Sequence, residues 1–171
     1  MKELSFRTDV LPLKDELFRL ALRITLNRAD AEDVVQETML RVWKRRDQWA
    51  EVESMEAFCL TICRNQALDR MKRADHQNTS LEESHDRADG SYDSDPEQQT
   101  VMRDRVATVR RLINELPEKQ RSCMQLRDME GKPYKEIAQV MGITEQQVKI
   151  NIFRARKAIK ERFQQLDEHG L

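Results

Sequence analysis

A long acidic and polar segment divides this chain into two halves. It reads DHQNTSLEESHDRADGSYDSDPEQQ, from Asp75 to Gln99, and is nearly free of apolar side chains. Such a segment buries too little apolar surface to offset the entropy lost on ordering. We therefore predict a flexible acidic linker over residues 75–100, between one domain over residues 1–74 and another over residues 101–171. The linker would tether the two domains without fixing them to each other.

Both halves are rich in residues that favour helices. The chain has 171 residues, of which 36% are charged and 5% aromatic, with only 4 Gly and 4 Pro. No convincing run alternates apolar and polar β-branched residues, as a strand would. We predict an all-α fold of two small helical domains. No apolar run approaches the roughly 20 residues that span a bilayer, and MKELSFRTDV lacks a signal-peptide core. We expect a cytoplasmic protein without direct membrane insertion.

Three helices are predicted in the first half, around residues 17–24, 29–46 and 54–73, the last capped by Ser54. The inward stripe of the second helix is predicted to be Ala31, Val34 or Val35, Thr38 and Val42. Spacings of three and four place another set on a second face: Asp33, Gln36, Glu37 and Leu40. From spacing alone, that face is either an ordinary solvated surface or a contact surface.

In the second half, helices are predicted over residues 101–115 and 118–129. A short helix, Tyr134–Met141, then ends at Gly142, and a longer helix begins after Thr144. Thr144 and Gln147 have the spacing of a capping box. This arrangement is typical of a helix-turn-helix, whose second helix enters the DNA major groove. The outward residues are Gln146, Gln147, Lys149, Ile150, Asn151, Phe153 and Arg154. A surface helical hairpin with solvated charges is the alternative.

The charge is distributed unevenly. Residues 1–74 carry a net charge of +1, residues 75–100 carry −7 and residues 101–171 carry +5. A basic C-terminal half suggests a polyanionic partner. The acidic middle fits a solvated linker or a basic partner.

The sequence offers no catalytic constellation. The histidines, His76, His85 and His169, fall in the predicted linker and the tail, and there is no Walker loop or GxGxxG. The acidic segment lacks a glycine-punctuated ligand pattern. We therefore predict no enzyme activity, no cofactor and no metal.

The three cysteines, Cys59, Cys63 and Cys123, contain no CxxC pair. We interpret them as small buried thiols, with a redox switch as the alternative.

Trp49 lies in the polar stretch DQWAEVES, in the same half as a basic run over residues 70–73. An aromatic ring beside a basic helix could stack on an unpaired nucleobase. It could equally cover the small core of the first domain.

Three segments together resemble the bacterial sigma-70 family. DAEDVVQETMLRVWKRRDQW and FCLTICRNQALDRMKR resemble its region 2, and LPEKQRSCMQLRDMEGKPYKEIAQVMGITEQQVKINIFRARKAI resembles region 4. The short chain is similar to the extracytoplasmic-function (ECF) group. The resemblance covers nearly all of the chain outside the linker, and the paired motifs in this order are highly specific.

The resemblance implies a sigma factor that binds core RNA polymerase and directs it to promoter DNA. Region 2 of the family docks on the β′ clamp helices, here through Asp33, Gln36, Glu37 and Leu40, and region 4 is expected at the β flap. The expected contacts to the −10 element are Trp49, Arg64, Asn65, Arg70, Lys72 and Arg73. The helix-turn-helix residues given above would contact the −35 element. Many members are held inactive by an anti-sigma factor, which we also expect here.

One departure concerns Gln147, which stands where the family often has Thr and could alter the −35 preference.

The linker fits the resemblance as well. Two DNA elements two helical turns apart are separated by roughly 70 Å, whereas a free coil of this length spans roughly 25–30 Å. We therefore expect polymerase to hold the domains apart, and the free protein to bind promoters poorly.

Two other functions remain open. A stand-alone helix-turn-helix regulator would bind duplex DNA without polymerase. A protein-interaction module would hold a partner without touching DNA, and neutralising Lys149 and Arg154 would leave that activity intact.

Overall fold

The computed structural model describes residues 3–78 and 101–168 and contains only helices, turns and loops within them. The first half holds α1 (Lys14–Thr25), α2 (Arg28–Lys44) and α3 (Met55–Asn78), and the second holds α4 (Val101–Asn114), α5 (Glu118–Met124), α6 (Tyr134–Met141) and α7 (Glu145–Glu168). Short π-helical segments cover Phe6–Val10 and Gln125–Met129, and 3-10 segments cover Leu11–Leu13 and Arg46–Glu51. The all-α prediction is confirmed. Most of the predicted linker, residues 79–100, lies outside the described residues.

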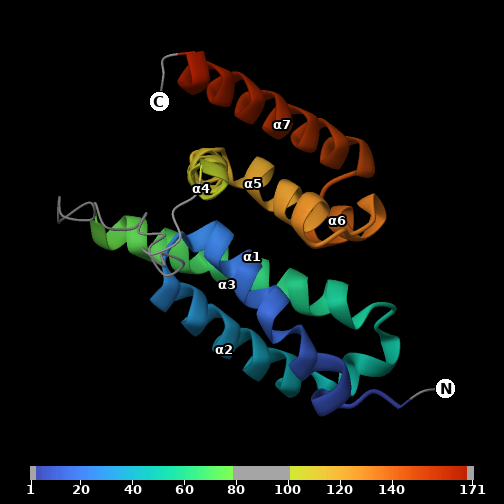
Figure 1. Ribbon diagram of the computed structural model, residues 1–171. Helices are drawn as coiled ribbons and strands as arrows, with labels where there is room; N and C mark the ends of the chain where they lie inside the picture. The colour runs from blue at the N-terminus through green and yellow to red at the C-terminus, as the bar shows by residue number, and fades with distance from the viewer. Residues whose placement is uncertain (1–2, 79–100, 169–171) are drawn as a thin grey trace.

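The three helices of the first half pack around one apolar core (Figure 1). Leu17, Leu20 and Ile24 of α1 are fully buried, and their spacings of three and four place them on one face of the helix. The predicted inward stripe of α2 is also buried, and both Val34 and Val35 take part. Burying large aliphatic side chains is the main source of stability for so small a unit.

Local signals set the helix boundaries of the first half. Leu26 adopts a left-handed conformation with φ 57° and ends α1, and the Asn27 side chain then accepts a hydrogen bond from the Asp30 backbone N–H at 2.9 Å. Ser54 Oγ accepts from the Ala57 N–H at 3.1 Å, which confirms the predicted cap. The third helix continues to Asn78 rather than ending at Arg73, because no glycine or proline interrupts that stretch.

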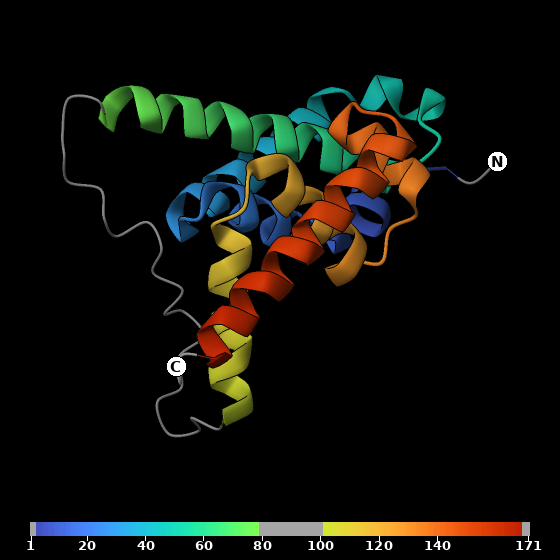
Figure 2. The ribbon, with the colours of Figure 1, turned by 90° about the horizontal axis from the view of Figure 1, so that it is seen from above.

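The second half is built around the crossing of α4, α5 and α6 with α7 (Figure 2). Val148, Ile152 and Ala155 of α7 are buried. Gly142, with φ 68°, supplies the left-handed turn between α6 and α7. A side chain is strained in this backbone conformation, which explains a glycine here.

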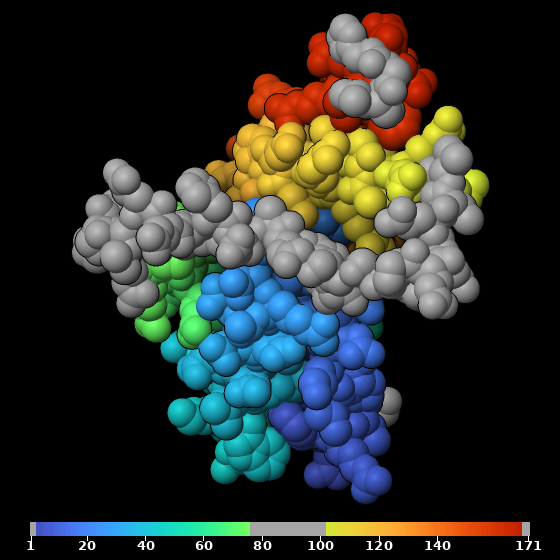
Figure 3. Space-filling view, turned by 60° about the vertical axis from the view of Figure 1, so that its left-hand side comes forward, coloured from blue at the N-terminus to red at the C-terminus, as the bar shows by residue number. Residues whose placement is uncertain are grey.

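The two halves pack against each other, unlike the independently placed domains that the linker suggested. The second half, from yellow to red, lies directly on the first, with α6 against α3 and α5 against α1 (Figures 1 and 3). Ile137, Val140 and Met141 of α6 belong to the same buried cluster as the core of the first half. Ile137 and Met141 are four residues apart and share one face of the helix, but spacing alone does not say which neighbour covers them.

Candidate nucleic-acid interface

The helix-turn-helix predicted from the sequence is present in α6 and α7. The Thr144 N–H donates to Gln147 Oε1 at 2.9 Å, and the Gln147 N–H donates to Thr144 Oγ1 at 3.1 Å. These reciprocal bonds form the predicted capping box and satisfy backbone donors that the helix start would leave unpaired. They also fix the direction in which α7 leaves the turn.

The outward face of α7 carries polar, basic and apolar groups together. Phe153 is 66% exposed and Ile150 is 39% exposed, although both are large apolar side chains. Gln146, Lys149 and Arg154 are exposed beside them. Amide, cationic and apolar groups on one helix can contact adenine edges, guanine or phosphate, and thymine methyls, respectively. The face therefore has the chemistry for major-groove contacts.

Gln147 is the exception on this face. Its side-chain oxygen accepts a hydrogen bond from the Thr144 backbone N–H at 2.9 Å in the capping box. A group committed to holding the helix start is less available to a base. The structure thus assigns Gln147 a positioning contact.

Two cations lie over the ring of Tyr134 at the start of α6. Lys149 Nζ is 5.3 Å from the ring centroid, and the Arg127 guanidinium carbon is 4.2 Å away. Nearby on α7, Arg156 forms a bidentate ion pair with Asp128. These contacts hold positive charge beside the exposed face of α7, where a phosphate backbone could approach.

The outward face of α2 is also accessible. Asp33, Gln36 and Leu40 are exposed, and Leu40 shows 53% of its surface, while Glu37 is half-buried. Arg70 of α3 pairs with Asp33 at 2.7 Å and with Asp30 at 3.2 Å. One predicted polymerase contact is therefore linked directly to one predicted −10 contact.

The six predicted −10 residues fall into two groups. Asn65, Lys72 and Arg73 are exposed on α3, and Arg70 is partly exposed beside α2. Arg64 and Trp49 are buried instead. Arg64 donates to Glu118 Oε1 of α5 at 2.8 Å and lies 3.5 Å from the Met141 carbonyl of α6. In this arrangement the second half covers it.

Trp49 belongs to the core of the first half. It is 7% exposed, and its indole N–H donates to the Val42 carbonyl at 3.1 Å. The structure favours the interpretation of Trp49 as a core cover. Its ring does not present a free face for stacking on a base in this arrangement.

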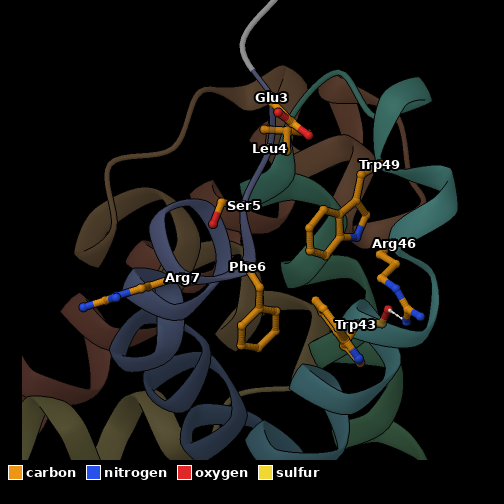
Figure 4. A pocket seen from close by; sticks show the side chains of 8 residues that line it. All are labelled: Glu3, Leu4, Ser5, Phe6, Arg7, Trp43, Arg46 and Trp49. Atoms are coloured by element: carbon orange, nitrogen blue, oxygen red, sulfur yellow. Dashed lines mark hydrogen bonds between the residues drawn. The ribbon is translucent and has the colours of Figure 1, made fainter.

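Sequence reasoning missed Trp43, which is the more exposed tryptophan. Trp43 is 46% exposed and makes edge-on contacts with Phe6 at 5.7 Å and Trp49 at 6.3 Å between centroids. The Arg46 guanidinium carbon lies 4.5 Å from its centroid. Together with residues 3–7 at the N-terminal end, the side chains of Trp43, Arg46 and Trp49 line an open pocket beside the end of α2 (Figure 4). Trp43 follows Leu40 by three residues in α2, which places both side chains on the outward side of this helix.

The three cysteines are buried and free of disulfides. Burial raises the pKa of the Cys59 and Cys63 thiols to about 12 and that of Cys123 to about 11. Thiols in this state are protonated and unreactive near neutral pH. The prediction of small buried thiols is confirmed.

The described residues contain no group of three or more His, Cys, Asp or Glu that could hold a metal ion. Within the same residues, no helix combines the length and apolar character needed to cross a membrane.

Two regions of the chain match known families. Residues 10–77 match Sigma-70 region 2, and residues 107–159 match Sigma-70, region 4. These matches coincide with the first half and with the helix-turn-helix half of the structure.

Several sigma factors are similar over most of the chain. ECF RNA polymerase sigma factor SigL of Mycobacterium tuberculosis is 31% identical over 151 residues, covering 88% of this chain and 84% of SigL. ECF RNA polymerase sigma factor SigE of Mycolicibacterium smegmatis is 30% identical over 86% of this chain but only 57% of its own length. The RNA polymerase sigma-H factor of Pseudomonas aeruginosa is 28% identical over 92% of this chain and 85% of its own length.

Solved structures share the fold at low identity. Sigma factor RpoE in complex with the anti-sigma factor NepR from Bartonella quintana has a TM-score of 0.78 at 20% identity, over 95% of this chain and 98% of that one. CnrH in complex with the cytosolic domain of CnrY has a TM-score of 0.67 at 20% identity, over 93% and 87% of the two chains. These structures show the fold alone. The matches to Sigma-70 regions 2 and 4 and to SigL show that the chain belongs to the sigma-70 family of RNA polymerase sigma factors and, within it, to the ECF group.

Proposed function

We propose that this chain is an RNA polymerase sigma factor that directs core polymerase to specific promoters and starts transcription there. The observation that carries the proposal is the joint presence, in one chain, of a region 2 with an accessible α2 face and a region 4 with an exposed recognition helix. The protein itself would perform no chemistry, and polymerase would make the RNA.

The −35 contact is assigned to the exposed face of α7. Gln146 and Arg154 supply hydrogen-bonding groups, and Asn151 supplies its side-chain oxygen, because its Nδ2 donates to the Gln147 carbonyl. Ile150 and Phe153 supply apolar contacts to thymine methyls. Lys149 would contact the phosphate backbone, because Tyr134 holds it beside the helix start. Gln147 would act through the capping box rather than on a base.

The −10 contact is assigned to α3, where Asn65 is exposed together with Lys72 and Arg73. Core polymerase would bind the α2 face formed by Asp33, Gln36, Glu37 and Leu40, through its β′ clamp helices. Region 4 would meet the β flap. Trp43 extends the apolar part of the α2 face and is added to the predicted docking residues.

An anti-sigma factor is a further expected partner. RpoE is described in complex with NepR, and CnrH in complex with CnrY. The likeness of fold to both supports the proposal that this chain is also held by a dedicated inhibitor.

The proposal is tested by measuring the affinity of core polymerase for the wild-type chain and for the pair of substitutions Asp33→Ala and Gln36→Ala. We expect the double variant to bind at least about tenfold more weakly, since a few residues near the centre of an interface carry most of its binding energy and a loss of about 1.4 kcal/mol is tenfold in affinity. Glu32→Gln is the matched control, because Glu32 is also exposed on α2 but pairs with Arg28 within the same helix.

A wild-type chain that fails to bind core polymerase but binds duplex DNA alone would establish the stand-alone regulator instead. Binding to neither polymerase nor DNA would favour the protein-interaction module.

A further inference from the structure

One arginine of α3 reaches across to the outward face of α2. Arg70 Nη2 donates to Asp33 Oδ2 at 2.7 Å, and Arg70 Nε donates to Asp30 Oδ1 at 3.2 Å. Both donors belong to the same planar guanidinium, so one rigid group bridges the two carboxylates. We call these contacts the Asp30–Arg70–Asp33 bridge. The resemblance placed Arg70 among the −10 contacts, but in the folded chain its charge lies against the first turns of α2.

The position of Arg70 around α3 differs from that of the exposed −10 residues. Asn65 and Lys72 are both exposed, and their spacing of seven places them about 20° apart around the helix axis. Arg70 follows Asn65 by five residues and is therefore about 140° away from it. Arg70 thus lies on the side of α3 that faces α2, whereas Asn65 and Lys72 share another side.

The Asp30 end of the bridge is the better fixed of the two. The Asp30 backbone N–H donates to the Asn27 side chain at 2.9 Å, in the cap that starts α2. Its carboxylate is also less exposed than that of Asp33. The guanidinium is therefore anchored at Asp30, and it presents a second N–H at a set position to Asp33.

Asp33 keeps the capacity to bind a partner while Arg70 holds it. Its side chain is half-exposed, and the one hydrogen bond from Arg70 uses only one of about four acceptor sites on a carboxylate. Without Arg70, the like charges of Asp30 and Asp33 would face each other at a spacing of three on one helix, and such neighbours repel. The bridge therefore restricts where the Asp33 carboxylate can point.

We propose that Arg70 is a positioning residue of the core-polymerase docking surface, which holds the Asp33 carboxylate ready for polymerase through the Asp30–Arg70–Asp33 bridge. This inference rests on the proposed function, and it moves Arg70 from the −10 contacts to the support of the docking surface. A side chain that is already ordered in the free chain loses less entropy when it binds. Loss of Arg70 should therefore weaken polymerase binding about threefold to tenfold, although Arg70 itself does not touch polymerase.

The inference is tested by measuring the affinity of core polymerase, without DNA, for four full-length chains: the wild type, Arg70→Ala, Asp33→Ala and the double variant. We expect Arg70→Ala to weaken binding about threefold to tenfold in the wild-type background. In the Asp33→Ala background it should cause no further loss, because no carboxylate remains to be positioned. A general loss of structure would instead weaken binding in both backgrounds.

Arg162→Ala is the matched control for the removal of an arginine. Arg162 is about as exposed as Arg70 and also forms an ion pair between two helices, with Glu115 of α4. Its loss makes the same change of charge far along the chain from α2. We expect this variant to bind core polymerase as the wild type does.

Run-off transcription separates docking from DNA contact. The chain is added in increasing amounts to core polymerase, kept below the wild-type Kd, with promoter-bearing fragments from the protein's own genome. For Arg70→Ala we expect the concentration that gives half-maximal transcription to rise about threefold to tenfold, with an unchanged maximum at saturation. A residue that acts on the −10 element would lower the maximum instead.

Three results would overturn the positioning role: polymerase affinity of Arg70→Ala equal to that of the wild type, an equal loss with and without Asp33, or a lowered maximum at saturation. The last result would return Arg70 to the −10 contacts. A failure of the proposed function is distinguishable from all three, because the wild-type chain itself would then not bind core polymerase, and both proposals would fall.

Discussion

Trp49 provides the sharpest test of how the first half is built. The sequence left two roles open, stacking on a base or covering the core, and the structure buries all but 7% of the side chain. Replacing a buried Trp by Ala typically costs about 3–5 kcal/mol, from the lost transfer free energy and the cavity left behind. The indole N–H bond to the Val42 carbonyl adds to this cost, because the carbonyl loses one partner.

For Trp49→Ala we therefore expect a free energy of unfolding lower by about 3–5 kcal/mol in urea denaturation followed by circular dichroism. For a chain of this size each kcal/mol lowers the melting temperature by roughly 2–4 °C. Trp43→Ala is the matched control: Trp43 is 46% exposed, so its loss should cost clearly less. Equal stability of Trp49→Ala and the wild type would refute the core assignment and restore Trp49 as a surface group.

The remaining predictions concern the second half and the thiols. Gln147→Ala removes the acceptor for the Thr144 N–H and should lower stability by about 1 kcal/mol in chemical denaturation, whereas Gln146→Ala, on the exposed face, should leave stability within about 0.5 kcal/mol. Lys149→Ala should weaken duplex DNA binding and reduce the slope of log K against log salt by about 0.9, if Lys149 contacts one phosphate; an unchanged slope would exclude that contact. The buried thiols have raised pKa values in the folded state, so their contribution to stability is complete below the ordinary thiol pKa and is lost as pH rises through about 11–12. A thiol reagent such as DTNB should label the chain slowly at pH 8 and label all three cysteines on unfolding; rapid labelling of the folded chain would contradict their burial.

Much of the fold could be predicted from local patterns. The spacing of Leu17, Leu20 and Ile24 determined the buried side of α1, and the Thr144–Gln147 pair located the start of α7. Gly142 located the turn before it. These features depend on neighbours within a turn or two, so one sequence contains the information needed.

Features that depend on distant contacts were not predictable in the same way. The buried ion pair of Arg64 joins α3 to α5, two segments separated by more than fifty residues. An arginine at a helical position looks like a surface group until the element that covers it is known. Trp49 was left undecided for a different reason: its partner Val42 is only seven residues away, but the sequence does not show that the turn of Arg46–Glu51 brings the indole N–H to the Val42 carbonyl.

In the candidate site, too, some features follow from local spacing and others depend on the three-dimensional contacts. The exposed face of α7 followed from helical periodicity, and the structure leaves Phe153 and Ile150 outward as predicted. The engagement of Gln147 in the cap followed from spacing as well, but its consequence for base contacts required the hydrogen-bond geometry. Trp43 was overlooked because an apolar residue on a helix is ordinarily assigned to the core.

The most direct test of the central claim is run-off transcription with purified core RNA polymerase and promoter-bearing DNA fragments from the protein's own genome. We expect specific transcripts that require this chain and that disappear when Asp33 and Gln36 are both replaced by Ala. Polymerase that produces the same transcripts with and without the chain, while the chain alone binds duplex DNA, would contradict the account.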